Sequence, residues 1–298
     1  LVAEGALVSF EAVEAERASE VLAAFQSTSG RALVEGAKVF EVESVDLITY
    51  PWEWPNSLLE AAALLTLDIR ERLLAIGLDL KDASAFNVQF RGSCPVFIDT
   101  LSFEARREGE PWVAYRQFCE QFVAPLALMA RRDARLSGLW RAQLDGVPLD
   151  LASLLLPRST WLRVGLLTHL PLHARSQAFY ADRPAPSRRV AVSETSLLAL
   201  LDSLRRTVRA LAPRRAPSEW ADYERTHAYT EESQRAKEQL VARWLERLRP
   251  SQAWDLGANV GRFSRIAASG GAYVVSFDVD PAVVEEAYRR GRGESRRD

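Results

Sequence analysis

The stretch AWDLGANVGRFS, near the end of the chain, carries the residue types and spacing best suited to ligand binding. Asp255 closes an apolar run, Gly257 and Gly261 follow on a turn, and Asn259 lies between them. Glycine permits a tight bend and places no Cβ between backbone and ligand, and the helix start that follows presents N–H groups to an anion. Asp278 closes the next apolar run, where a carboxylate can accept hydrogen bonds from both hydroxyls of a ribose.

Two strands and two helices must position these residues. The runs AWDLG and AYVVSFDVD are apolar and short enough to be buried strands, and NVGRFSRIAAS and PAVVEEAYRR have helical patterns. A strand-helix-strand-helix order predicts a parallel, doubly wound sheet. Ligands of such sheets bind at the carboxyl ends of the strands, which is where the turn lies.

The spacing of the turn separates two classes of ligand. A dinucleotide site needs the pattern G-x-G-x-x-G, whereas this chain has Gly257, Asn259 and Gly261 and no third glycine for the pyrophosphate turn. The sequence therefore disfavours NAD. A second interpretation stays open, in which the two strands belong to another Rossmann-like sheet and the glycines serve only the turn.

The motifs D-L-G-A-N-x-G-x-F-S and F-D-x-D-P resemble the first two motifs of class I S-adenosylmethionine-dependent methyltransferases. This resemblance implies that Asp255, Gly257 and Gly261 shape the pocket for the methionine part of S-adenosylmethionine. It also implies that Asn259 replaces a middle glycine and that Asp278 binds the ribose. The implied reaction is methyl transfer to an unidentified acceptor, either a small molecule or a protein, with catalytic residues unknown.

The long segment ahead of these motifs is similar to the arrangement in bacterial nodulation-type methyltransferases. The chain begins with Leu1 rather than Met and continues only a short way past Asp278, so both ends look like those of a fragment. We expect the protein to be truncated at its C-terminus. The methyltransferase domain would then be partial. A further alternative is a truncated interaction protein without catalytic activity.

A second polar group lies in the middle of the chain. The pattern predicts strands at 88–90 and 96–98 joined by a turn at Gly92, a β-hairpin that brings Asn87 and Asp99 to its open end. With Asp82, these residues resemble the catalytic loop and the metal-binding Asp of protein-kinase-like phosphotransferases. The resemblance implies that Asp82 is the base and that Asn87 and Asp99 hold Mg²⁺ for a Mg-ATP substrate.

The hairpin departs from the kinase pattern at positioning residues. Leu80 and Lys81 replace the His-Arg pair, Ser84 replaces a Lys, and Asp99 is followed by Thr100 and Leu101. Phosphoryl transfer depends almost wholly on positioning and charge neutralisation. Three interpretations stay open: a kinase-like scaffold or pseudokinase that binds a partner, a working phosphotransferase, and a polar hairpin without such a role.

The predicted fold combines an α+β region with the start of a doubly wound α/β sheet. A helix is expected at about 57–76, where Ser57 and Glu60 fit a capping box, and short strands are expected at 32–36, 38–44 and 46–50. Further helices are expected at about 112–130, 196–212 and 231–249, the last carrying Leu240, Trp244 and Leu248 on one face. We divide the chain into a kinase-like region 1–180, a linker 181–195, a helical connector 196–249 and a partial Rossmann-like methyltransferase domain 250–298.

Composition limits the partners and the compartment. The net charge of −2 comes from 38 basic and 40 acidic residues that are interspersed, so nothing indicates nucleic acid or an anionic membrane. No apolar run is long enough to span a bilayer, and two cysteines are too few for a disulfide framework. We expect a bacterial cytoplasmic protein whose oligomeric state the sequence leaves open. His169 and His173 share a spacing that could suit a metal, but Pro171 lies between them and no third ligand is evident.

Overall fold

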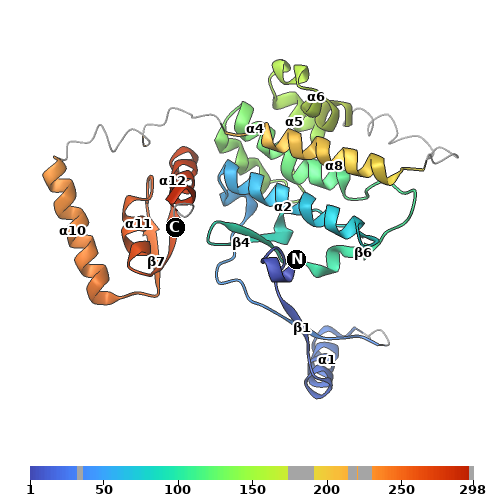
Figure 1. The fold of residues 1–298 in the computed structure, drawn as a ribbon, viewed down its shortest axis with the longest axis horizontal. Helices are drawn as coiled ribbons and strands as arrows, with labels where there is room; N and C mark the ends of the chain where they lie inside the picture. The colour runs from blue at the N-terminus through green and yellow to red at the C-terminus, as the bar shows by residue number, and fades with distance from the viewer. Residues whose placement is uncertain (32–35, 174–190, 214–219, 221–229, 295–298) are drawn as a thin grey trace.

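The computed structural model describes residues 1–31, 36–173, 191–213, 220 and 230–294. In these residues the protein is mixed α/β: helices predominate, and the strands form four separate two-stranded sheets. Figure 1 shows a helical body, a small N-terminal projection and a C-terminal unit beside the body. Within the described ranges, none of the helices combines the length and the apolar composition needed to cross a membrane.

The N-terminal projection is small and exposed. Strand β1 (Phe10–Ala12) pairs antiparallel with β2 (Phe40–Val42), helix α1 (Ala15–Ser29) connects them, and none of their residues is buried. The strand expected at 32–36 lies almost entirely outside the described residues. The strand expected at 46–50 is wrong: the segment pairs with no strand, and the Gln89 side chain bonds the backbone of Thr49.

The Gln89 side chain binds both the N–H and the carbonyl of Thr49. Its Oε1 accepts from the Thr49 N–H at 3.0 Å, and its Nε2 donates to the Thr49 carbonyl at 3.0 Å. Side-chain amides can satisfy a backbone donor and acceptor together. Segment 46–50 is therefore held without strand pairing.

Helix α2 (Asn56–Leu74) runs through the middle of the body and matches the helix expected there. Leu59, Ala63 and Leu67 recur at helical spacing and are fully buried. The expected capping box is wrong: Pro55 is the N-cap and no side chain caps this helix end. Ser57 instead binds a residue of the C-terminal unit, as described below.

The predicted hairpin is confirmed. Strands β4 (Val88–Arg91) and β5 (Cys94–Phe97) pair antiparallel, with Arg91 opposite Cys94, and Gly92 has a φ of 59° in the turn. That left-handed conformation favours glycine. A second pair, β3 (Leu78–Leu80) and β6 (Phe103–Ala105), flanks the hairpin in sequence and is also antiparallel.

The rest of the body is helical and irregular. The helix expected at 112–130 contains a π-helical turn just before Pro125, which lacks an N–H and cannot continue a regular α-helical ladder. The elements are α3 (Tyr115–Phe118), η5 (Cys119–Val123), α4 (Ala124–Arg131), η6 (Ala134–Arg141), α5 (Leu149–Leu155), η7 (Arg158–Leu162), α6 (Val164–Leu167), η8 (Thr168–Leu172) and α8 (Glu194–Arg209). Short 3-10 turns precede them at Val2–Glu4, Pro51–Glu53, Ala85–Asn87 and Thr100–Ser102.

One hydrophobic core joins these elements. It includes Leu7 near the N-terminus, the inner residues of α2 and α4, and Leu197, Leu201 and Leu204 of α8. Figure 1 shows α8 beside α2, and the two helices are in contact. Helix α8 therefore packs with the body, although it follows the segment 181–195 that we expected to be a linker. Residues 181–190 of that segment lie outside the described residues.

The C-terminal unit has the predicted order of elements. Strands β7 and β8 pair in parallel, with Asp255 opposite Ser276 and Leu256 opposite Phe277, and a helix connects them. The unit contains α10 (Glu231–Leu248), β7 (Gln252–Leu256), α11 (Arg262–Ser269), β8 (Tyr273–Phe277) and α12 (Pro281–Glu294). Thr230 caps α10 through its side chain, which accepts from the Ser233 N–H.

The prediction that both strands are buried is wrong. Trp254 and Leu256 are 60% and 74% exposed, and Phe277 is exposed as well. Alternate residues of a strand point to opposite faces. Asp255 and Ser276 lie on the face that bonds to Ser264 of helix α11, whereas Trp254, Leu256 and Phe277 lie on the other face and are exposed. The apolar face expected on α10 is also not buried.

Candidate functional site

The turn between β7 and α11 has the backbone that its glycines predict. Gly257 and Gly261 have φ values of 75° and 76°, and Asn259 lies in the same left-handed region with a φ of 49°. Asn tolerates this conformation better than most residues because its short polar side chain bonds locally. Here Asn259 Oδ1 accepts from the Val260 N–H at 2.7 Å.

The turn is tied to the end of the neighbouring strand. The N–H groups of Gly257 and Ala258 both donate to the carbonyl of Phe277, each at 2.9 Å. The Asn259 N–H donates to Asp278 Oδ2 at 2.9 Å, and the Asp280 N–H donates to Asp278 Oδ1 at 3.0 Å. The structure therefore brings Gly257, Asn259 and Asp278 together at the carboxyl ends of both strands.

The N–H groups of the turn itself already have acceptors, because those of Gly257 through Gly261 all bond within the unit. The expectation of N–H groups open to an anion concerns the start of α11, which follows the turn, and these bonds leave it unchanged. The turn is thus held in place before any ligand arrives. Space remains where a ligand would approach, because a Cβ added at Gly257 would meet no atom within 4 Å.

Asp255 is turned toward helix α11. Its Oδ2 accepts from Ser264 Oγ at 2.6 Å, and Ser276 Oγ donates to Ser264 Oγ at 2.8 Å. This chain of bonds links β7, α11 and β8, so the Asp255 side chain positions the helix under the turn. The sequence interpretation gave neither serine a role, although Ser264 is the last residue of the motif quoted above.

The segment before α10 also reaches the turn. Asn259 Nδ2 donates to the carbonyl of Trp220 at 2.9 Å. Helix α10 is fixed to α11 by Arg262, which binds Glu238 at 2.7 Å, and by Lys237, which lies 5.0 Å from the ring centre of Phe263. Part of the approach to Asn259 is therefore lined by the chain that precedes the unit.

The C-terminal unit contacts the body through a buried carboxylate. Glu285 of α12 is 9% exposed, accepts from the Ser57 N–H at 3.0 Å through Oε2, and accepts from the Ser57 hydroxyl through Oε1. Arg289 binds the same carboxylate at 2.8 Å. A carboxylate at the start of α2 satisfies a free N–H and complements the helix dipole. Burial and the charge of Glu285 raise the pKa of the nearby Glu60.

The polar residues of the hairpin also come together. Asn87 Nδ2 lies 3.5 Å from the Asp82 carbonyl and donates to Ser102 Oγ at 3.2 Å, while Ser102 Oγ donates to Asp99 Oδ2 at 2.7 Å. Asp82 Oδ1 accepts from the Ser84 N–H and from Gln117 Nε2. The three predicted residues thus form one network, in which the Ser102 hydroxyl lies between Asn87 and Asp99.

His169 of η8 is buried and bonds to residues of two other helices of the body. Its Nδ1 lies 2.7 Å from the Tyr115 hydroxyl and its Nε2 lies 2.9 Å from Ser203 Oγ, so both ring nitrogens have partners. His173 stacks on Tyr115, with ring centres 4.6 Å apart. Burial lowers the pKa of His169 to about 4, which keeps the ring neutral. Among the residues described, no cluster of three or more His, Cys, Asp or Glu side chains could hold a metal ion.

Together these observations define a mixed α/β protein with a parallel β-α-β unit whose glycine turn faces a strand-end aspartate. The chain is 35% identical over 297 residues to the nodulation protein NoeA of Rhizobium meliloti (strain 1021). The match covers 97% of this chain and 60% of that protein, so the chain spans well under two thirds of its relative. No family model matches the chain, and no solved structure matches it.

The comparison with NoeA bears on the nodulation-type resemblance seen in the sequence. The similarity to NoeA agrees with the nodulation-type resemblance at the level of overall sequence. The name of that protein states no reaction, so methyl transfer and the use of S-adenosylmethionine stay predictions. The assignment of the site residues to a cofactor rests on the motifs and on the geometry described above.

Proposed function

We propose that the β7-α11-β8 unit binds S-adenosylmethionine and that the protein of which it is part transfers a methyl group to an acceptor. The observation that carries this proposal is the pairing of the glycine turn with Asp278 at the carboxyl ends of two parallel strands. Open parallel sheets bind nucleotide ligands at this place. Similarity to NoeA leads us to propose a nodulation-related role for that reaction.

The residues present fit the ligand. Each Asp278 oxygen accepts one backbone N–H, and a carboxylate oxygen has a second lone pair that can accept from a ribose hydroxyl. Gly257 leaves open space beside the turn, where a side chain would stand in the way. The Rossmann-like fold of a methyltransferase is the wider structure that this unit would belong to.

Methyl transfer requires little acid or base catalysis from side chains beside the cofactor. Bound S-adenosylmethionine supplies a sulfonium methyl group that a nucleophile can attack directly. The task of this chain is to hold the nucleoside in one orientation, which the preset turn and Asp278 do without further rearrangement. The acceptor is a small molecule or a protein group, and the described residues do not single out a base for it.

We expect Asp278→Asn to weaken binding of S-adenosylmethionine about tenfold or more, because the neutral amide loses a charge-assisted hydrogen bond to the ribose. Isothermal titration calorimetry on the 298-residue chain measures the effect. Asp280→Asn is the matched control, since Asp280 caps α12 through the Ala282 N–H two residues further on. Equal affinity in the wild type and Asp278→Asn would contradict the assigned role.

A kinase-like phosphotransferase is the second candidate, favoured by the network that joins Asp82, Asn87 and Asp99. One carboxylate and one amide suit Mg²⁺, which commonly takes few protein ligands beside substrate phosphates. The Ser102 hydroxyl lies between them, so both could bind one ion only after Ser102 turned away. This second candidate therefore ranks below methyl transfer.

Calorimetry with Mg-ATP separates the two candidates. Methyl transfer predicts saturable heat with S-adenosylmethionine and none with Mg-ATP. Saturable heat with Mg-ATP alone, abolished by Asp99→Ala, would replace our first proposal with the phosphotransferase. Binding of neither ligand would favour the third interpretation, an interaction protein without catalytic activity.

A further inference from the structure

A pocket in the helical body lies apart from both sites discussed so far. It has a volume of about 240 Å³ and is formed between α4, α6 and α8. Its lining combines apolar residues, two hydroxyl side chains and three arginines, Arg131, Arg163 and Arg206. None of the described residues that line the pocket is acidic.

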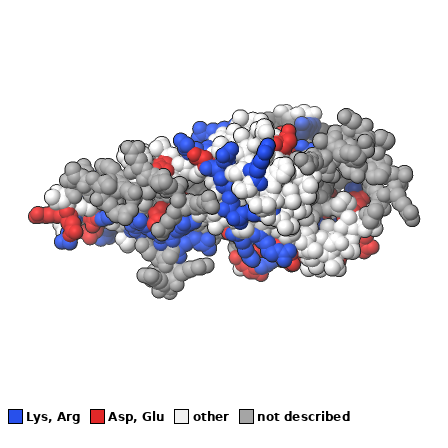
Figure 2. Space-filling view, turned by 90° about the horizontal axis from the view of Figure 1, so that it is seen from above, with Lys and Arg blue, Asp and Glu red and all other residues white. Residues whose placement is uncertain are grey.

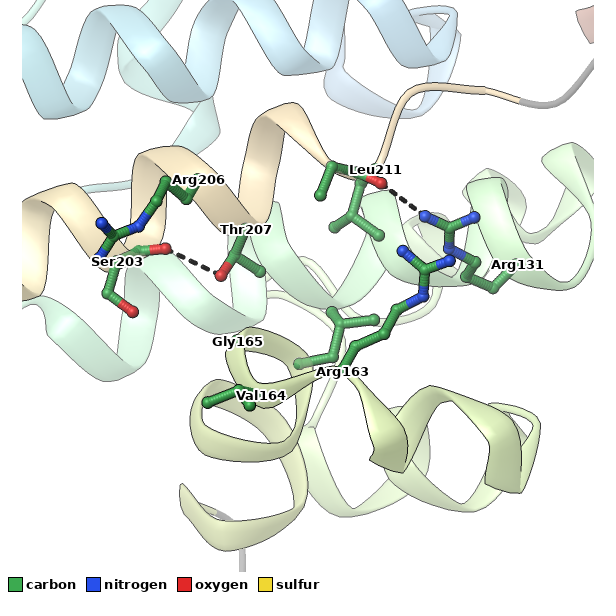
Figure 3. A pocket seen from close by; sticks show the side chains of 10 residues that line it. Arg131, Arg163, Val164, Gly165, Ser203, Arg206, Thr207 and Leu211 are labelled. Atoms are coloured by element: carbon green, nitrogen blue, oxygen red, sulfur yellow. Dashed lines mark hydrogen bonds between the residues drawn. The ribbon is translucent and has the colours of Figure 1, made fainter.

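The floor of the pocket depends on a close approach of two helices. A Cβ added at Gly165 would lie 2.1 Å from Thr207 Oγ1, so only glycine lets α6 approach α8 this closely. Figure 3 shows Gly165 and Val164 on one side of the pocket and Thr207 and Leu211 on the other. The wall of the pocket between α6 and α8 is therefore set by close packing.

The arginines differ in their direction. Figure 3 shows Arg131 and Arg163 extending toward the same end of the pocket, near Leu211, whereas Arg206 lies on the other side of Thr207, near Ser203. Arg131 donates to the Ala210 carbonyl at 2.5 Å. The backbone of Arg163 bonds to Thr160 and Leu167, whereas its guanidinium has no hydrogen-bond or ion-pair partner among the described residues.

The surroundings add positive charge. The upper side of the molecule in Figure 1, where α5, α6 and α8 lie, is viewed directly in Figure 2. Figure 2 shows Lys and Arg side chains gathered in a band across this side, with few acidic side chains inside the band. Two guanidinium groups directed to one place favour a doubly charged anion over a single carboxylate.

We infer that this end of the pocket binds a phosphate group, held between Arg163 and Arg131. The guanidinium groups donate in pairs to the phosphate oxygens, a geometry that their planar shape suits. Arg131 keeps its bond to Ala210, which fixes its position at the pocket wall. The site is independent of the proposed methyl transfer, because it shares no residue with the C-terminal unit.

Isothermal titration calorimetry with inorganic phosphate at low ionic strength tests this site on the full chain. We expect saturable binding that weakens at least about tenfold in Arg163→Gln. Arg206→Gln is expected to change affinity less than about threefold, because its side chain lies at the other end of the pocket. Arg158→Gln is the matched control for the loss of one exposed positive charge, since Arg158 does not line the pocket.

A second arm distinguishes a soluble phosphate from a lipid headgroup. Flotation is measured with vesicles of phosphatidylcholine alone and with added phosphatidic acid. Binding to free phosphate assigns the site to a soluble ligand, and binding only to phosphatidic acid vesicles assigns it to a lipid headgroup. In both cases Arg163→Gln must weaken the binding that is observed. The inference is overturned if neither probe binds, or if Arg158→Gln weakens binding as much as Arg163→Gln does.

Discussion

Replacement of Asp79 by Ala is expected to lower the free energy of unfolding by about 3–5 kcal/mol. Asp79 of β3 binds Arg70 of α2 through two bonds, Nε to Oδ1 at 2.9 Å and Nη2 to Oδ2 at 3.2 Å. The Arg70 side chain is 0% exposed and lies over the ring of Trp112, 4.3 Å from its centre. Without Asp79 the guanidinium would be a buried charge with no counterion.

Chemical denaturation with urea at pH 7 measures this effect. The matched control is Asp68→Ala, which removes an exposed carboxylate of α2 that binds Arg205 and should cost less than about 1 kcal/mol. The double variant Arg70→Met with Asp79→Leu should recover most of the loss, because it removes both buried charges together. A cost for Asp79→Ala no larger than that of Asp68→Ala would refute this role for the pair.

Stability is expected to fall between pH 7 and pH 4 because of His169. Burial holds its pKa at about 4 in the folded protein, whereas an unfolded chain has the ordinary value near 6.5. In this window the unfolded state binds a proton that the folded state does not, so the contribution is complete above about pH 6.5 and is lost as the pH falls toward 4. The full difference amounts to about 3 kcal/mol.

Urea denaturation at pH 7 and pH 5 tests the direction of the change in stability and whether His169 causes it. The wild type should lose about 2 kcal/mol more between these values than His169→Gln, which has no titrating group there. His173→Gln is the companion variant, since burial also lowers the pKa of His173. Equal losses in the wild type and His169→Gln would show that other groups dominate the acid sensitivity.

Local patterns predicted the elements around the candidate site. The β7-α11-β8-α12 order and the hairpin around Gly92 follow from periodicity and turn residues within a few positions of each other. Gly257, Asn259 and Gly261 adopt the left-handed backbone that their types favour. These features depend on neighbours in sequence, which is why the sequence could predict them.

Contacts between distant residues were not predictable in this way. The capping box at Ser57 failed because Glu285, which lies 228 residues further along, takes the bonds that a local cap would make. Segment 46–50 carries a strand-like pattern, yet it pairs with no strand, and the Gln89 side chain bonds the backbone of Thr49. The bond between Asp255 and Ser264, and the link of Asn87 to Asp99 through Ser102, also depend on how separate elements pack together.

The sequence alone determined the chemistry available at the turn, because glycines, an asparagine and two aspartates at this spacing admit few ligand classes. Only the tertiary structure decided that the N–H groups of the turn are already bonded, that Asp278 faces Asn259, and that Trp254 and Leu256 stay exposed. It also decided that Arg131 and Arg163 share one pocket. The physical reason is that residue types and local spacing fix conformation, whereas burial and bonding partners depend on which distant elements pack together.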